Sequence, residues 1–149
     1  MLIRRDRGLV AVAVMLDVAF YGGRAATVSA ADIADRLGLA RRGMEPLLQA
    51  LSRAGLLESV RGPRGGYRLG RPRRDIALAD IVAVAAADEA APTDGPTGRL
   101  QDAVVDGLWG ELEEQARAQL AGLTLDDLIR RAAAAGLRRP AAEPISFAI

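Results

Sequence analysis

The sequence contains no cysteine, no histidine and no lysine, and only 5 of its 149 residues are aromatic. The missing cysteine and histidine exclude disulfides, thiolate- or imidazole-ligated metals, cysteine nucleophiles and acid–base cycles that use imidazole. We therefore do not expect an enzyme. The 30 alanines, set against so few aromatic residues, indicate an interior of closely packed helices, which predicts an α-rich fold.

Long hydrophobic runs are also missing, since no stretch reaches the roughly 20 apolar residues of a membrane-spanning helix. Residues 1–7 and the apolar run 9–16 have the outline of a short signal peptide, but Asp17 interrupts that run. Its apolar residues also recur at helical spacing, at Leu9, Ala13, Leu16 and Phe20. This spacing favours an amphipathic core helix instead, in a soluble, cytoplasmic protein.

The positive charges are all arginine and are unevenly placed along the chain. Residues 1–74 hold 14 arginines against 6 acidic residues, a net charge of +8, and residues 75–149 hold 6 against 13, a net charge of −7. The two halves add up to the overall charge of +1. A basic half joined to an acidic half predicts an anionic partner at one end and a protein-facing or solvated surface at the other.

Three helices are expected in the first part of the chain, over residues 6–21, from Ser29 to Gly38, and from about Arg41 to Gly55. The Ser29 hydroxyl can cap the first N–H groups of the second helix. The third helix has an apolar stripe formed by Met44, Leu47, Leu48 and Leu51. Two helices joined by a short turn in this way have the spacing of a helix-turn-helix.

A β-hairpin is expected directly after this pair, because strand-like runs at 57–61 and 66–69 flank the turn residues 62–65. A hairpin at this place is typical of a winged helix. The hairpin and its exit carry six arginines: Arg61, Arg64, Arg68, Arg71, Arg73 and Arg74. They are candidates for contact with an anionic partner, although arginine in turns can also serve solubility alone.

Helices also dominate the expected C-terminal half. We predict one from Ile76 to about Glu89, a Pro/Gly-rich loop over 90–98, and a long helix over 99–121. A capping box of Thr124 and Asp127 opens a last helix that runs to about Ala135. The tail from residue 137 contains two prolines and is expected to be extended or mobile.

The long helix has an apolar stripe that a small winged domain cannot bury alone. Its members are Leu100, Val104, Leu108, Trp109, Leu112 and Leu120. Pairing with the same helix of a second subunit would cover them. The expected organisation is a DNA-binding region (1–75), a connecting helix and loop (76–98), a dimerisation helix with a final short helix (99–136), and an extended tail (137–149).

The third helix offers side chains that can read DNA. The face opposite its apolar stripe displays Arg41, Arg42, Glu45, Gln49 and Arg53. Arginine can bind guanine, glutamate can accept a hydrogen bond from cytosine, and glutamine can pair with adenine. The alternative is a solvated helix face with a contact between Glu45 and Gln49.

The hairpin tip and the N-terminus offer further cationic candidates. Arg61 and Arg64 would enter a minor groove or clamp phosphates, and Arg4, Arg5 and Arg7 would add phosphate contacts. Adjacent acidic pairs such as Asp126 and Asp127 point to different sides of a helix and form no catalytic dyad. The glycine-rich hairpin turn lacks the Lys-Ser/Thr ending of a phosphate loop.

Five segments together resemble a known family: residues 15–19, 33–38, 51–69, 108–109 and 123–128. They are similar to the Rrf-two (Rrf2) family of bacterial winged-helix regulators, of the IscR, NsrR and CymR type, over residues 1 to about 131. The resemblance implies a homodimer that crosses its long helices and controls transcription at palindromic operators. It also implies that Glu45 and its neighbours lie in the major groove and Arg61 in the minor groove.

The sequence departs from that family at two places. Many members hold an iron–sulfur cluster through three cysteines, sometimes with a histidine, whereas here Ala103 and Asp106 stand at the last cysteine and the histidine positions. We therefore expect no cluster and no cofactor, because the irons need thiolates. Pro46 would remove a hydrogen bond to the Arg42 carbonyl, so the third helix is expected to start near Gly43 or to have a distorted first turn.

The sequence thus predicts a mainly α fold: a winged helix-turn-helix with a two-stranded β wing and a long C-terminal dimerisation helix. The expected function is that of a dimeric, sequence-specific transcriptional regulator, acting as a repressor on double-stranded DNA without an iron–sulfur cluster. A small molecule or a protein is a possible effector. The alternative is a winged-helix module that binds an acidic protein partner rather than an operator.

Overall fold

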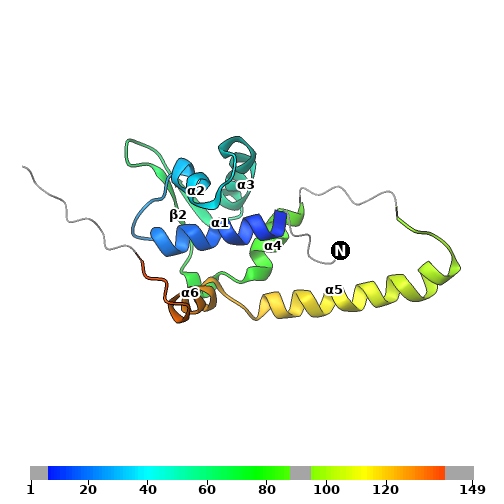
Figure 1. Cartoon of the computed structure of the whole chain (residues 1–149). Coiled ribbons are helices and arrows are strands. Elements are labelled where there is room, and N and C mark those ends of the chain that lie inside the picture. The colour runs from blue at the N-terminus through cyan, green and yellow to red at the C-terminus, as the bar shows by residue number, and fades with distance from the viewer. Residues whose placement is uncertain (1–6, 88–94, 140–149) are drawn as a thin grey trace, which may run out of the picture.

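The computed structural model describes residues 7–87 and 95–139 (Figure 1). Within them the chain forms six α-helices, two strands, a short 3-10 helix (Arg73–Asp75) and a short π-helix (Gln101–Val105). The elements are α1 (Arg7–Tyr21), α2 (Ala30–Leu37), α3 (Arg41–Arg53), β1 (Leu57–Val60), β2 (Gly66–Leu69), α4 (Leu78–Ala87), α5 (Asp106–Ala121) and α6 (Leu125–Ala134). The expected mainly helical fold with a two-stranded wing is confirmed.

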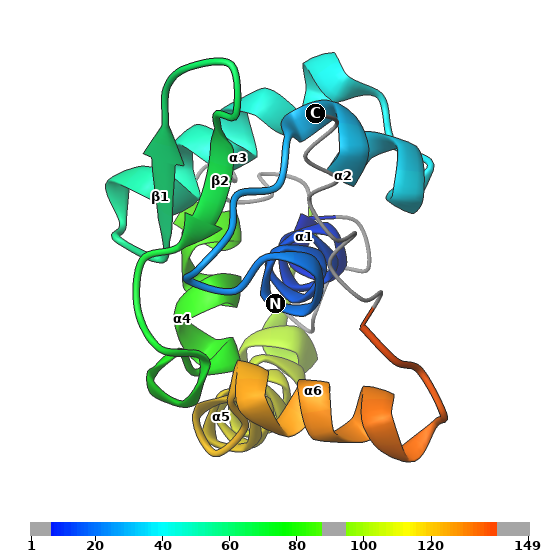
Figure 2. The same ribbon diagram turned by 90° about the vertical axis from the view of Figure 1, so that its left-hand side faces the viewer.

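Helix α1 lies at the centre, with α2, α3 and the wing on one side of it and α5 and α6 on the other (Figures 1 and 2). The expected core face of α1 was wrong. Its buried apolar residues are Ala11, Val14, Met15, Val18 and Ala19, whereas Leu9 is 57% exposed and Ala13, Leu16 and Phe20 are half-buried. Because α1 is apolar on nearly every side, its packing partners, not its periodicity, decide which face is buried.

The helix-turn-helix forms as the local sequence signals indicate. The Ser29 hydroxyl accepts a hydrogen bond from the Asp32 N–H at 3.1 Å, and Gly38 ends α2 in the left-handed conformation with φ of 64°. Helix α3 begins at Arg41, so of the two expected alternatives, a later start near Gly43 or a distorted first turn, the later start is excluded. Pro46 is accommodated inside the helix, and the Gly43 N–H bonds the Ala40 carbonyl three residues back at 3.2 Å.

The wing is a regular antiparallel hairpin in which Leu57 pairs with Leu69 and Val60 with Gly66. It is joined to the start of the helix-turn-helix by two reciprocal 2.8 Å hydrogen bonds between Val28 and Tyr67. The absence of a side chain at Gly66 permits this approach, since a Cβ there would collide with the Val28 carbonyl. The wing is therefore fixed to the helix-turn-helix by backbone contacts.

Helix α4 starts at Leu78, two residues later than expected. Ile76 and Ala77 are extended instead and pair with the segment before α6: the Leu78 N–H bonds the Leu123 carbonyl at 2.8 Å, and the Leu125 N–H bonds the Ile76 carbonyl at 3.0 Å. This pairing bridges two segments far apart in sequence, which is why local signals do not show it. The expected end of the helix near Glu89 and most of the loop lie outside the described residues.

The long helix begins at Arg99, passes through one π-helical turn at Gln101–Val105, and continues as α5 to Ala121. Its N-terminal half projects beyond the rest of the molecule (Figure 1). The predicted capping box of Thr124 and Asp127 opens α6. Residues 140–149 of the tail lie outside the described part. No helix in the described ranges is long and apolar enough to cross a membrane.

Candidate nucleic-acid interface

Helix α3 separates its apolar and polar residues onto opposite faces. Met44, Leu48 and Leu51 are buried against the core. The predicted base-contacting residues are all exposed: Arg41, Arg42, Glu45 and Gln49. The Arg41 Nε lies 3.7 Å from the Glu45 Oε1, so the neighbour of Glu45 is Arg41 and not Gln49. Such an exposed pair one helical turn apart is weak and is easily exchanged for contacts with a ligand.

The wing tip presents two arginines to solvent. Arg61 and Arg64 are exposed and make no ion pair with any residue that the structure describes. The hydroxyl of Thr27 donates to the Arg64 carbonyl at 2.7 Å, which ties the tip to the segment before α2. The tip is therefore held in place by its backbone, while its guanidinium groups stay available.

The other wing arginines have structural partners. Arg68 forms two hydrogen bonds of 3.0 and 3.1 Å with Glu58 across the hairpin, and these hold the pKa of Glu58 below its usual range. Arg73 bonds Asp126 of α6 at 2.7 Å, and Arg71 contacts the Ala54 carbonyl. From the sequence alone the six arginines of the hairpin and its exit are equivalent candidates. In the structure Arg68 and Arg73 form ion pairs within the chain, whereas Arg61 and Arg64 at the tip do not do so with any described residue.

Helix α3 and the wing tip lie on the same side of α1 in both views (Figures 1 and 2). This surface combines an exposed helix that offers hydrogen-bonding side chains with a cationic hairpin beside it. Major-groove contact by the helix and backbone or minor-groove contact by the hairpin are compatible with this arrangement. Of the other predicted phosphate contacts, Arg4 and Arg5 lie outside the described residues, and Arg7 is exposed at the start of α1.

The predicted dimerisation stripe falls into two parts. Leu100, Val104, Leu108 and Trp109 are exposed, with exposed fractions from 46% to 79%. Leu112 is half-buried, and Leu120 packs against the core of its own chain. Exposed large apolar residues that follow one another along a projecting helix mark an interaction surface.

The fold, together with the surface formed by α3 and the wing tip, defines a winged helix-turn-helix protein. Residues 5–131 match the Rrf2 family, described as an iron-dependent transcriptional regulator. The chain is 36% identical over 130 residues to the HTH-type transcriptional regulator IscR of Vibrio atlanticus, covering 84% of this chain and 73% of that protein. For IscR of Escherichia coli O1:K1 the identity is 35% over 127 residues, covering 83% and 78%.

Solved structures of regulators of the same type are also similar to this chain. IscR of T. potens superposes with a TM-score of 0.71 at 31% identity, covering 93% of both chains. CymR of B. subtilis, the global cysteine regulator, superposes with a TM-score of 0.68 at 26% identity, covering 88% of this chain and 98% of the other. The chain belongs to the Rrf2 family. It is a DNA-binding transcriptional regulator and not an enzyme.

The residues of this chain do not fit the iron–sulfur cluster that the family implies. The sequence has no cysteine and no histidine, and the described residues include no group of three or more acidic side chains placed to hold a metal ion. Carboxylates do not replace the thiolates that such clusters require. Ligation of the IscR type is therefore ruled out for this chain.

Proposed function

We propose that the protein is a homodimeric repressor that recognises a palindromic operator without a cluster or other cofactor. Residues 1–75 form the DNA-binding region in this proposal, and residues 99–136 form the dimerisation region. The observation that carries it is the exposure of Arg61 and Arg64 at the wing tip, beside the exposed polar face of α3. Neither guanidinium group forms an ion pair within residues 7–87 and 95–139. Occupation of promoter DNA by such a dimer would block transcription directly.

Each group has a distinct role in this proposal. Arg41, Arg42, Glu45 and Gln49 contact base edges in the major groove. Glu45 accepts a hydrogen bond from a cytosine amino group once its ion pair with Arg41 opens, and this contact supplies sequence preference. Arg61 and Arg64 supply the charge that attracts the DNA backbone or a narrow minor groove. Arg4 and Arg5 add phosphate contacts.

The dimer is supported by the exposed stripe of α5. Two copies crossing about a two-fold axis would bury Leu100, Val104, Leu108 and Trp109, with Leu112 and Leu120 at the end of the contact. The two α3 helices would then enter successive major grooves, which requires half-sites one helical turn or a multiple apart. The operator should therefore be an imperfect palindrome.

Selection of duplexes from a random library by the purified protein tests the proposal. We expect a palindromic motif to be enriched, and Glu45→Ala to relax the preference at one base pair of each half-site. Arg131→Ala, which removes an exposed arginine on α6, is the matched control and should leave the motif unchanged. Retention of DNA without any enriched motif, abolished by salt, would favour a module that binds an acidic protein.

A further inference from the structure

A cavity of about 370 Å³ lies behind the N-terminal half of α3 and is bordered by residues of α1 and α4. Residues that line it include Arg7 and Val10 of α1, Gly43, Met44 and Leu47 of α3, and Ala85 of α4. Pockets for small molecules usually measure about 300–1,000 Å³. This volume lies near the lower end of that range and fits a compact ligand.

The cavity exists because small residues stand where α3, α1 and α4 meet. Ala40 and Gly43 at the start of α3 and Ala85 on α4 leave space that longer side chains would fill. Gly43 adopts an ordinary backbone conformation, and a Cβ built on it meets no atom within 4 Å. The backbone at residue 43 would therefore accept a residue with a side chain, and neither strain nor crowding requires glycine there.

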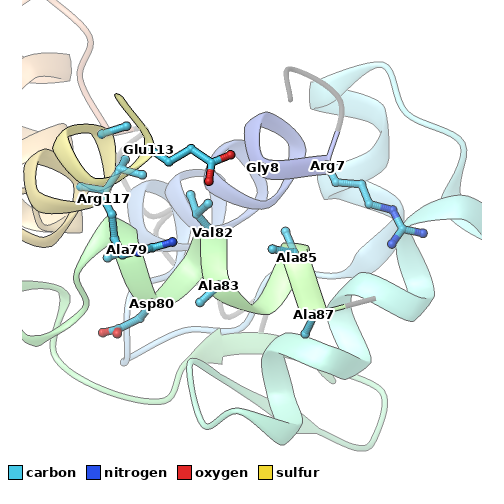
Figure 3. A pocket seen from close by; sticks show the side chains of 13 residues that line it. Arg7, Gly8, Ala79, Asp80, Val82, Ala83, Ala85, Ala87, Glu113 and Arg117 are labelled. Atoms are coloured by element: carbon cyan, nitrogen blue, oxygen red, sulfur yellow. The ribbon is translucent and has the colours of Figure 1, made fainter. Parts of the chain in front are cut away.

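The lining has a single charge. It is apolar apart from Arg7 and contains no acidic residue. Arg7 makes no ion pair with any residue in the described ranges. It also lines a larger hollow between α1, α4 and α5, but its side chain extends away from Glu113 and Arg117 of that hollow (Figure 3). An apolar hollow with one unpaired guanidinium at its edge complements an apolar molecule that carries one carboxylate.

The helix turn in front of the cavity is weakly held. Pro46 has no N–H to bond the Arg42 carbonyl, and Ala40 offers no side chain to cap the first N–H groups of α3. This turn carries Arg41, Arg42 and Glu45 on its outer face. A molecule that fills the cavity would support the turn from behind and so change how those side chains meet DNA.

We propose that this cavity is a binding site for a compact apolar organic carboxylate, which acts as an effector by positioning the first turn of α3. The carboxylate pairs with Arg7, and the apolar body packs against Met44, Leu47 and Val10. The effector role rests on the proposed function of α3 in DNA recognition, whereas the binding site itself does not.

Methionine methyl NMR tests the site without DNA. Met44 lines the cavity and Met15 is buried in the central core, so the two methyl resonances report on the site and on the fold separately. Full-length protein labelled at the methionine methyl carbons is titrated with octanoate, benzoate and indole-3-acetate. We expect at least one of these carboxylates to shift the Met44 resonance saturably and to leave that of Met15 in place.

Three variants define the site. Gly43→Leu fills the cavity mouth and should abolish the Met44 shift while the Met15 resonance shows that the fold is kept. Arg7→Gln should weaken binding of the carboxylate roughly tenfold and leave binding of its neutral amide unchanged, as expected for the loss of one charge-assisted contact. Arg131→Gln removes the same charge from α6 and should change neither affinity.

Two results would overturn the proposal. One is the absence of any saturable Met44 shift with all three carboxylates at millimolar concentration. The other is a Met44 shift that depends only on protein concentration, which would show that a second copy of the chain fills the cavity. Operator affinity is measured separately with and without the bound carboxylate. A protein that binds the carboxylate but prefers no operator would count against the proposed function alone.

Discussion

Asp17 of α1 and Arg36 of α2 form a two-point ion pair, with 2.9 Å between Nε and Oδ1 and 2.8 Å between Nη2 and Oδ2. Asp17 is only 6% exposed, and the Arg36 guanidinium also lies 3.9 Å from the centre of the Tyr21 ring. The pair fixes the first helix of the helix-turn-helix against the central helix. The orientation of α2 against α1 therefore depends on a buried charge that is not among the proposed DNA-contacting residues.

We expect Asp17→Asn to lower the free energy of unfolding by about 2 kcal/mol, because it leaves a partly buried guanidinium without its charged partner. The estimate lies below that for a fully buried pair, since the Arg36 side chain is 31% exposed. Urea unfolding at pH 7 measures the change. Glu114→Gln, which breaks the exposed pair with Arg117, is the control and should have little effect. Equal unfolding midpoints for both variants would contradict this role of Asp17.

The wing should depend on Gly66. We expect Gly66→Ala to lower the free energy of unfolding by about 2 kcal/mol or more, because its Cβ would push the Val28 carbonyl away and break the pairing with Tyr67. Gly43→Ala, at an exposed helical position with open space, should be neutral or slightly stabilising. Thermal unfolding of the two variants compares them. A Gly66→Ala protein as stable as the wild type would show that the wing is not held by this approach.

Stability should fall in acid partly through Asp127. Hydrogen bonds from the Thr124 N–H and hydroxyl hold the pKa of this carboxyl below its usual range. Its stabilising effect is therefore fully present above the unfolded-state pKa of about 4 and is lost as the pH falls through the lower folded-state pKa. Asp127→Asn should reduce the loss of stability between pH 5 and pH 3, measured by urea unfolding at several pH values. An unchanged pH dependence in this variant would contradict the assignment.

The wing-tip arginines should contribute to DNA affinity through charge. We expect Arg64→Ala to weaken binding to all duplexes and to reduce the slope of log affinity against log salt concentration by about one. Fluorescence anisotropy over a salt series measures both quantities. Arg131→Ala should leave the slope unchanged, and an equal effect of both substitutions would show that the charge acts only through the overall field of the protein.

The exposed stripe of α5 should control the oligomeric state. We expect Leu108→Asp to convert a dimer into a monomer, because a carboxylate at this position would be buried in the contact without a partner. Sedimentation velocity at several concentrations measures the mass. Leu137→Asp places the same charge on another exposed leucine outside α5 and should leave the dimer intact. A wild-type chain that sediments as a monomer would contradict the dimer directly.

Sequence alone located the elements of the winged helix-turn-helix because their boundaries are set by local chemistry. Ser29, Gly38 and Gly55 delimit the two helices, and the glycine-rich turn defines the wing. The face of α1 was not predictable, since an apolar helix surrounded by partners has no single hydrophobic stripe. The start of α4 was not predictable either, because the pairing of Ile76 with Leu125 joins segments about fifty residues apart.

The site was predicted less completely than the fold. Residue type and position on the helix were enough to place Glu45 and Gln49 on the exposed face of α3. Arg68 is paired with Glu58 because of the hairpin register, and Arg73 is paired with Asp126 because of a contact with α6. The sequence shows neither the register nor the contact. An aspartate inside the apolar α1 was the one available signal for the Asp17–Arg36 pair. The cavity behind α3 arises from small residues at the start of α3 and on α4, where these elements meet α1, and had no sequence signal.

The central claim is that this member of the Rrf2 family recognises its operator without an iron–sulfur cluster. The most direct test is the ratio of affinities for the selected palindrome and for a scrambled duplex, measured before and after exhaustive treatment with an iron chelator. We expect the palindrome to be favoured by at least about a thousandfold, within the range of specific DNA-binding proteins, and the ratio to be unchanged by the chelator. A ratio near one in both samples, or a preference that the chelator abolishes, would contradict the claim.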